Sequence, residues 1–205
     1  MEKKILPFKI LNLLQEKTDE THHLQQKQIV ELLAENGFDC DRRTVRASVD
    51  LLQEVGYDIP YDEGYYLAER VFEDAELRML IDSVLFSKVL TVRQSGRLIT
   101  KIKNLGNENF RKKVPDIKML SGIGWSQNKE FLLTVTALNE AISRKHKVTF
   151  VYQKYGADLK LHDSGHLHKV SPYYLLAANG YYYLMCNEEN HDNVIYYRID
   201  RMVKV

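Results

Sequence analysis

The stretch Gly37-Phe-Asp-Cys-Asp-Arg-Arg-Thr-Val-Arg-Ala-Ser-Val-Asp-Leu-Leu-Gln-Glu-Val-Gly56 decides how the N-terminal third of the chain is interpreted. Its first four residues form a short break. Asp41 can then cap a helix, because its side-chain oxygen accepts a backbone N–H that has no partner within the helix. Apolar residues follow at positions i, i+4 and i+7 of one helix face, namely Val45, Val49 and Leu52. The sequence therefore predicts a helix from about Asp41 to Val55.

Two amphipathic segments precede this helix and a hairpin pattern follows it. Residues 4–16 and 25–36 carry apolar side chains at helical spacing, and a polar loop separates them. Residues 57–67 resemble a short hairpin, because two aromatic-rich runs flank the turn-forming Asp62-Glu-Gly64. Helix, helix, tight turn, helix and hairpin is the element order of a winged helix-turn-helix. We predict this domain for residues 1–70.

The outer side of the Asp41–Val55 helix indicates contact with duplex DNA. If the apolar residues face inward, four side chains point outward near its beginning, namely Arg42, Arg43, Arg46 and Ala47. An arginine there can bind guanine O6 and N7, and a small alanine can approach a thymine methyl. Thr44 and the helix N-terminus suit a phosphate oxygen. The predicted DNA contacts are Arg42, Arg43, Thr44, Arg46, Ala47 and, in the hairpin, Tyr65. The alternative is a solvated helix face with incidental arginines.

The charge distribution limits this prediction. The net charge is +1, but residues 1–70 carry 9 Lys and Arg against 14 Asp and Glu, which gives −5. The remaining 135 residues carry 20 against 14, which gives +6. DNA contact in the first segment must therefore come from a local basic patch. The same imbalance motivates an alternative, in which the chain is a single-stranded nucleic-acid or nucleotide binding module and its N-terminal domain serves assembly.

The rest of the chain predicts a helical connector and a small β-rich domain. Residues 71–128 contain two helical patterns, 73–90 and 96–105, and the pattern lapses over 106–124. In residues 129–205, a helix over 130–145 precedes four strand-like runs, 148–152, 169–176, 181–186 and 194–199. Asn179-Gly180 suits a two-residue hairpin turn. We predict an α+β fold that ends in a strongly bent antiparallel sheet or barrel behind one helix.

Residues of the β-rich segment suit an anionic ligand. Arg198 and Arg201 flank Asp200, and nine of the 13 tyrosines lie in the segment from Tyr152 to Tyr197. Guanidiniums and tyrosine hydroxyls can bind phosphate, and aromatic strands can stack bases. The alternative is that the tyrosines pack the core. His162, His166 and His168 lie in a polar stretch that we expect to be a hairpin loop, and without a second ligand cluster they predict no metal site.

Several classes of protein are not indicated by the sequence. No apolar run approaches the roughly 18 to 20 residues that cross a bilayer, and the apolar N-terminus lacks a signal-peptide cleavage site. Cys40 and Cys186 are far apart and outside any CxxC motif, which fits free thiols in a reducing cytoplasm. Known catalytic and cofactor motifs are missing. We therefore expect a cytoplasmic protein that is not an enzyme and carries no cofactor.

The C-terminal third resembles the WYL family of bacterial regulators. The resemblance rests on Pro172-Tyr-Tyr-Leu-Leu-Ala-Ala-Asn-Gly-Tyr-Tyr-Tyr-Leu184 and on Tyr197-Arg-Ile-Asp-Arg-Met202, which occur in the family's order and approximate spacing. Tyr182 replaces the tryptophan that gives the family its name. The N-terminal part resembles the winged helix-turn-helix that usually precedes this domain, and Asp41-Arg-Arg-Thr-Val-Arg46 matches the start of its recognition helix.

This resemblance implies a DNA-binding transcription regulator. Its WYL domain would be an Sm-like barrel that senses a ligand, often nucleic acid or a nucleotide, and modulates duplex binding. The residues that match or lie near the family's basic and aromatic positions are His168, Lys169, Tyr183, Arg198 and Arg201. Helix-turn-helix proteins usually bind DNA as dimers, so we expect a homodimer. Many members continue past the Arg-Ile-Asp-Arg element, and the end of this sequence at Val205 leaves that point open.

Overall fold

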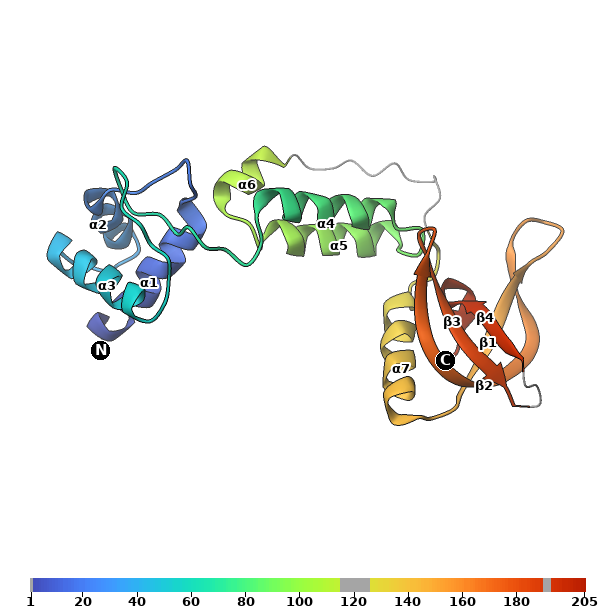
Figure 1. Ribbon diagram of the computed structural model, residues 1–205. Coiled ribbons are helices and arrows are strands. Elements are labelled where there is room, and N and C mark those ends of the chain that lie inside the picture. The colour runs from blue at the N-terminus through green and yellow to red at the C-terminus, as the bar shows by residue number, and fades with distance from the viewer. Residues whose placement is uncertain (1, 115–125, 190–192) are drawn as a thin grey trace. The chain divides into compact units, whose positions relative to one another are not determined.

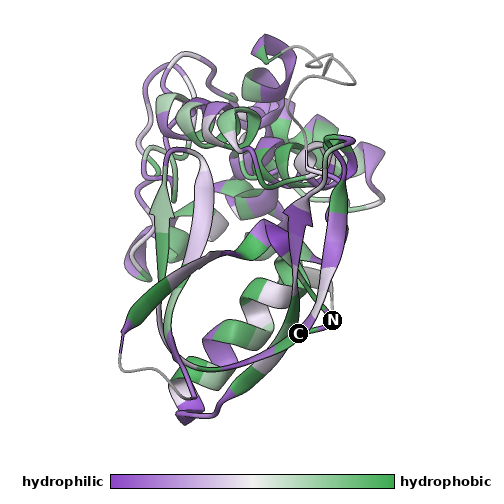
Figure 2. Cartoon of the chain, turned by 90° about the vertical axis from the view of Figure 1, so that its right-hand side faces the viewer, coloured by the Kyte–Doolittle hydropathy of each residue, from purple (hydrophilic) through white to green (hydrophobic). Residues whose placement is uncertain are grey.

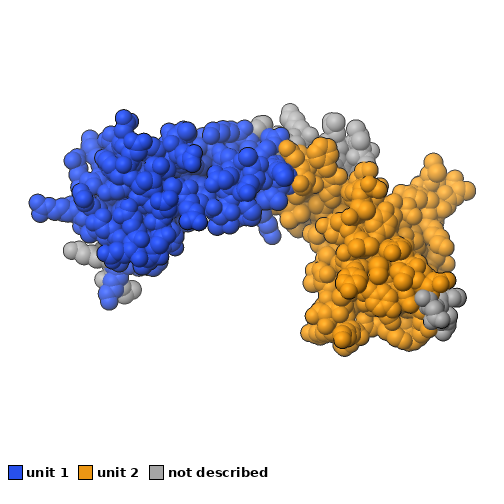
Figure 3. Space-filling view, in the orientation of Figure 1, with its two compact units in different colours: residues 1–81, 100–117 blue, residues 82–99, 118–205 orange. Residues whose placement is uncertain are grey.

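The computed structural model describes residues 2–114, 126–189 and 193–205, and it places them in two compact units. One unit comprises residues 1–81 and 100–117, and the other comprises residues 82–99 and 118–205 (Figure 3). The first consists of helices and the second contains a five-stranded antiparallel sheet (Figure 1). The predicted α+β class is thereby confirmed.

Three helices form the N-terminal part of the first unit. They are α1 (Glu2–Lys17), α2 (Gln26–Glu35) and α3 (Arg42–Glu54), and they begin and end close to the residues expected from periodicity. Asp41 caps α3 as predicted, since its Oδ1 accepts the Thr44 N–H at 2.8 Å. The helices share one apolar core, whose most deeply buried members are Ile10, Leu14, Ile29, Val45 and Val49. Burial of these side chains from three helices is the main force that holds the unit together.

The segment predicted as a hairpin is an irregular loop from Asp58 to Ala68 that folds back on itself through an isolated antiparallel bridge, Tyr61 to Tyr65, and a backbone hydrogen bond of 2.9 Å from Ala68 N–H to Asp58 O. It is fastened to the α1–α2 connection, because Leu24 and Tyr65 exchange two backbone hydrogen bonds of 2.9 and 2.8 Å. Gly64 allows this close approach. A Cβ at that position would lie 2.8 Å from the carbonyl carbon of Leu24. The loop therefore packs by backbone contact and does not build a regular two-stranded ladder.

Helices α4 (Asp74–Phe86) and α5 (Val92–Lys103) lie in the predicted connector, followed by a short α6 (Glu108–Lys113). Helix α6 forms within residues 106–124, where the helical pattern of the sequence lapses, so that prediction was incomplete. Residues 115–124 lie outside the described part. A side-chain cap explains α6: the side-chain Oδ1 of Asn107 accepts the Phe110 N–H at 2.7 Å. The amide of Asn107 also donates to Thr18 O and Asp19 Oδ2, at 2.8 and 2.9 Å.

The second unit packs α7 (Phe131–Arg144) against a strongly curved sheet (Figure 2). The strands are β1 (Val148–Tyr155), β2 (Leu161–Ala178), β3 (Tyr181–Glu188), β4 (Val194–Arg198) and β5 (Met202–Val203), in the order β4-β3-β2-β1-β5. Its core contains fully buried residues from the helix, the strands and the turn before β5, including Leu138, Phe150, Val170, Leu184, Ile199 and Met202. Leu133 of α7 lies outside this core, with 72% of its surface exposed.

The prediction of a barrel was wrong, because the strands that the structure describes do not close into one. The sheet has two edges, β4 and β5, and no hydrogen-bonded ladder joins them. The chain crosses from β4 to β5 in a single 3-10 turn, Ile199–Arg201, and β5 is only two residues long. This leaves too little strand for a ladder. A side chain spans part of the opening instead, where the backbone N–H of Arg198 donates to the Tyr152 hydroxyl at 3.3 Å.

The prediction of a loop around His162, His166 and His168 was also wrong. All three histidines lie within β2, which is 18 residues long. Strand β1 continues past a register shift near Tyr152 and pairs as far as Tyr155 with Leu161. The polar composition of this stretch reflects exposure of both strand faces, since every residue from His162 to Leu167 is exposed.

Candidate nucleic-acid and ligand sites

The positively charged side chains on the outer face of α3 lie near the beginning of the helix. Arg42, Arg43 and Arg46 are exposed, whereas Val45 and Val49 on the opposite side are fully buried. Within the described part of the chain, none of the three guanidiniums forms an ion pair with a carboxylate. Their donors are therefore available to an external acceptor.

Two other predicted residues of α3 differ in their availability. Ala47 is exposed beside the arginines, as expected. Thr44 is only half-exposed, and its hydroxyl donates to Asp41 Oδ1 at 2.6 Å. These bonds from Thr44 hold the pKa of the Asp41 carboxyl below its usual value. The Thr44 hydroxyl thus serves the helix cap first, and its own contact with a phosphate would need that bond to rearrange.

Acidic residues adjoin this basic face. Asp50 and Glu54 follow on α3, and Asp58, Asp62 and Glu63 lie in the Asp58–Ala68 loop; all five are exposed. The basic surface is thus confined to the first half of the helix. The excess of acid counted in residues 1–70 lies partly on the loop that follows it.

The structure buries Tyr65. Only 7% of its surface is exposed, and its hydroxyl accepts a hydrogen bond of 3.2 Å from Gln26 Nε2. The exposed aromatic side chain of the same loop is Tyr61, at 61%, which packs edge-on against Tyr65 with 5.0 Å between ring centroids. Sequence alternation gave no way to choose between the two faces of this loop, so Tyr61 was missed.

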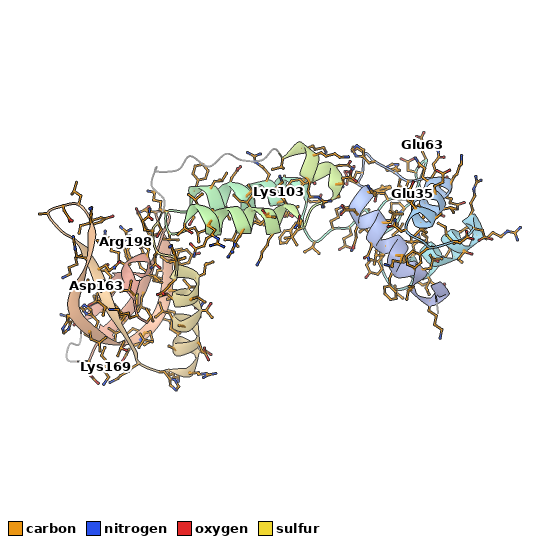
Figure 4. The ribbon with its side chains drawn as sticks, turned by 180° about the vertical axis from the view of Figure 1, so that it is seen from behind. Glu35, Glu63, Lys103, Asp163, Lys169 and Arg198 are labelled. Atoms are coloured by element: carbon orange, nitrogen blue, oxygen red, sulfur yellow. The ribbon has the colours of Figure 1, made fainter. Side chains whose placement is uncertain are left out.

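The five predicted ligand residues do not converge. Figure 4 shows Arg198 and Lys169 at opposite ends of the sheet. Near Arg198, Tyr183 is its direct partner across β3 and β4, and Tyr181 stacks on it with 3.6 Å between Cζ and the ring centroid. The Arg201 guanidinium lies 5.1 Å from the Tyr155 ring centroid.

His168 belongs to a half-buried polar cluster. Its Nδ1 lies 2.7 Å from Glu188 Oε1 and 3.0 Å from the Tyr197 hydroxyl, and its ring stacks on Phe150. Burial, together with the hydrogen bond to Glu188, raises the pKa of Tyr197 above its ordinary value. The next residue, Lys169, pairs with Glu189 at 2.8 Å. Both predicted basic residues already have a carboxylate partner here.

Arg198 lines a groove of the second unit. Its volume is about 870 Å³, and all of its lining residues belong to the second unit. Besides Arg198, its charged and aromatic lining residues are Lys88, Lys129, Glu130, Tyr155, Lys160, Tyr181 and Asp200. These residues come from segments far apart in the sequence. No spacing rule could have brought them together, and for this reason the lysines were missed.

The C-terminal segment matches a known family. Residues 134–205 match the family model described as the WYL domain, so this part of the chain is a WYL domain, as its motifs predicted. Among solved structures, the chain is similar to proteasome accessory factor B/C (PafBC) of Arthrobacter aurescens, with 14% identity and a TM-score of 0.29. The alignment covers 96% of this chain and 32% of that one, so the chain spans about a third of that protein's length. No curated protein matches the chain significantly.

Among the residues that the structure describes, no helix combines the length and apolar composition needed to cross a membrane. No group of three or more His, Cys, Asp or Glu side chains among them is arranged to hold a metal ion.

Proposed function

We propose that the chain is a DNA-binding transcription regulator. Residues 1–70 act as a winged helix-turn-helix, with α2 and α3 as its two helices, α3 as the recognition helix and the Asp58–Ala68 loop as the wing. Residues 71–128 connect this domain to residues 129–205. That WYL domain senses a nucleotide or nucleic acid and modulates duplex binding.

One observation carries the DNA-binding proposal: the arginines of α3 are exposed and form no ion pair with any carboxylate that the structure describes, while the other face of the helix is buried. Recognition helices contact base edges with their N-terminal residues, and the major groove is wide enough to admit a helix. Arg42, Arg43 and Arg46 lie in that half of α3. Ala47 is small enough to allow close approach to a base pair.

The first test is selection of duplexes from a random pool, followed by affinity measurements on the selected site. Loss of one bidentate contact costs about 1 to 3 kcal/mol of discrimination, so the triple change of Arg42, Arg43 and Arg46 to Ala should abolish specific binding. A control triple, Arg144, Lys154 and Lys204 changed to Ala, removes the same net charge from the second unit. Equal affinity of the α3 variant and wild type would contradict the proposal.

The proposed ligand site is the groove that Arg198 lines, with Tyr183 and Arg201 beside it. A planar anionic ligand suits these side chains, because guanidiniums bind phosphate and tyrosines stack bases. His168 and Lys169 lie elsewhere on β2, so they would contact only a ligand long enough to extend along the sheet. Fluorescence anisotropy with a labelled oligothymidylate should show weaker binding for Arg201→Ala and Tyr183→Ala, and no change for the control triple.

A second candidate function is suggested by the acidic residues beside α3. In it, the WYL domain binds single-stranded nucleic acid and the N-terminal domain serves assembly. This candidate predicts that no duplex is enriched in the selection and that the α3 triple variant binds oligothymidylate as wild type does. Light scattering tests the proposed homodimer, and a two-fold symmetric selected site would support it independently.

A further inference from the structure

Helix α5 has an unusual charge pattern. Its 12 residues, Val92–Lys103, include four basic side chains and no acidic one. Arg93, Arg97 and Lys101 follow one another at four-residue spacing, and all three are exposed. The buried residues Ser95 and Ile99 lie on the opposite side of the helix. The three cations therefore form one stripe, which we call the α5 stripe.

This pattern costs helix stability. Like charges at i and i+4 destabilise a helix by roughly 0.2 to 0.5 kcal/mol per pair, and the α5 stripe contains two such steps. Three other helices of the chain place opposite charges at this spacing. Their i, i+4 positions hold ion pairs of opposite sign in α2 (Lys27–Glu31), α6 (Glu108–Lys112) and α7 (Glu140–Arg144). No ion pair of Arg93, Arg97 or Lys101 is found among the described residues, so the α5 stripe keeps its full charge.

DNA binding by this chain needs such a surface. Contacts to phosphate supply essentially all sequence-independent affinity of DNA-binding proteins and a large share of their specific affinity. Residues 1–70 carry a net charge of −5, and exposed acids adjoin the basic half of α3. Three arginines can read bases, but they leave little positive charge for the backbone. A second cationic element must supply that charge if the chain binds duplexes well.

We propose that the α5 stripe binds the phosphate backbone of duplex DNA. From Arg93 to Lys101 the helix rises about 12 Å at 1.5 Å per residue. A DNA strand carries one phosphate per 3.4 Å of helix axis, so this length faces three to four phosphates of one strand. The contact carries no sequence information, because it involves only the backbone. The inference rests on the proposed DNA binding and adds to it the surface that provides affinity.

The test uses the full chain and a labelled duplex of about 30 base pairs with an arbitrary sequence. Anisotropy between about 50 and 300 mM KCl gives the slope of log K against log salt, which is near −0.9 for each phosphate neutralised. For R93Q/R97Q/K101Q we expect that slope to become shallower by roughly 2 to 3 and binding to weaken on every sequence alike. R93K/R97K keeps the charge and should keep the slope. R144Q/K154Q/K204Q removes three charges elsewhere and should keep it as well.

Stability provides a separate readout. Because R93Q/R97Q/K101Q removes like-charge repulsion, its thermal midpoint should stay the same or rise while DNA affinity falls. An unchanged salt slope in this variant, or an equal loss in the control, would overturn the inference and leave α3-dependent binding intact. If wild type binds no duplex at any salt concentration, the proposed function fails together with the inference. Weak duplex binding combined with tight binding to an acidic protein would also overturn it.

Discussion

The guanidinium of Arg198 is held by the carboxylate of Asp200 through two hydrogen bonds, Nε to Oδ1 at 3.1 Å and Nη2 to Oδ2 at 2.8 Å. Only 22% of the Arg198 side chain and 10% of the Asp200 side chain are exposed. The pair lines the groove of the WYL domain. Asp200 takes two of the five N–H donors of Arg198, so an anionic ligand must bind to the remaining donors, displace Asp200, or bind to the lysines of the groove.

The first prediction concerns the strength of this pair. Removing one partner of a largely buried ion pair leaves the other charge desolvated and unpaired. We expect Asp200→Ala to lower the free energy of unfolding by about 2 to 3 kcal/mol, measured by urea denaturation. The double change of Arg198 and Asp200 to Ala should cost less than the sum of the single changes. Additive losses would show that the pair contributes no coupling energy.

The second prediction concerns pH. Burial raises the pKa of Asp19, but hydrogen bonds from His22, Asn107 and Thr21 outweigh it and hold the pKa well below its usual range. A carboxyl with a lowered folded-state pKa adds stability above its unfolded pKa of about 3.9, and that stability is lost as the pH falls through the folded value.

We therefore expect Asp19→Asn to be less stable than wild type at pH 7, by about 2 kcal/mol, because hydrogen bonds to a charged group are lost. The difference should shrink progressively below pH 4. Urea denaturation at several pH values measures it, with Asp39→Asn, an exposed acid, as the control. A difference that is constant from pH 7 to pH 2 would show that the charge of Asp19 does not matter.

The third prediction compares two buried helical serines. Ser48 donates a hydrogen bond of 2.8 Å to Thr44 O, whereas Ser95 Oγ is buried without a partner among the described residues. An unsatisfied buried hydroxyl costs about 1 to 3 kcal/mol. Ser95→Ala should therefore leave the free energy of unfolding unchanged or raise it by about 1 kcal/mol, and Ser48→Ala should lower it. The reverse order of thermal midpoints would contradict this assignment.

The fourth prediction concerns the acidic loop beside α3. Asp62 and Glu63 are exposed, and each repels a DNA backbone that approaches the first unit. We expect the double change D62N/E63Q to raise duplex affinity several-fold at low salt, with a smaller gain at high salt because charges are then screened. The double change E140Q/D163N removes two acids from the second unit and should have no such effect. Equal affinities of D62N/E63Q and wild type would place the loop away from DNA.

Several features follow from local sequence. Helices α2, α3 and α7 could be predicted because apolar residues recur at the period of one helix face. Asp41 could be named as a cap because capping depends only on residues in the first turn. The WYL motif could be recognised because its Pro, Asn-Gly, Tyr-Leu and Arg-x-Asp-Arg elements occur in a fixed order within one segment.

The errors have a common cause. Extended backbone with polar residues on both faces has no distinctive period, so the His162–His168 stretch was assigned to a loop although it pairs in β2. Tyr61 and Tyr65 cannot be told apart by sequence, because which face of a loop is buried depends on the element that packs against it. Barrel closure depends on strand length and curvature over the whole sheet.

The sequence by itself determined the helices, the cap of α3, the basic half of that helix and the WYL motif, because each depends on residues close together in the chain. Only the tertiary structure decided that Arg198 is held by Asp200, that His168 is held by Glu188, and that Tyr65 is buried. It also brought lysines from distant segments to the groove beside Arg198. Such relationships depend on how the elements pack, since a side chain's charge and hydrogen-bonding capacity remain available only where no neighbour already uses them.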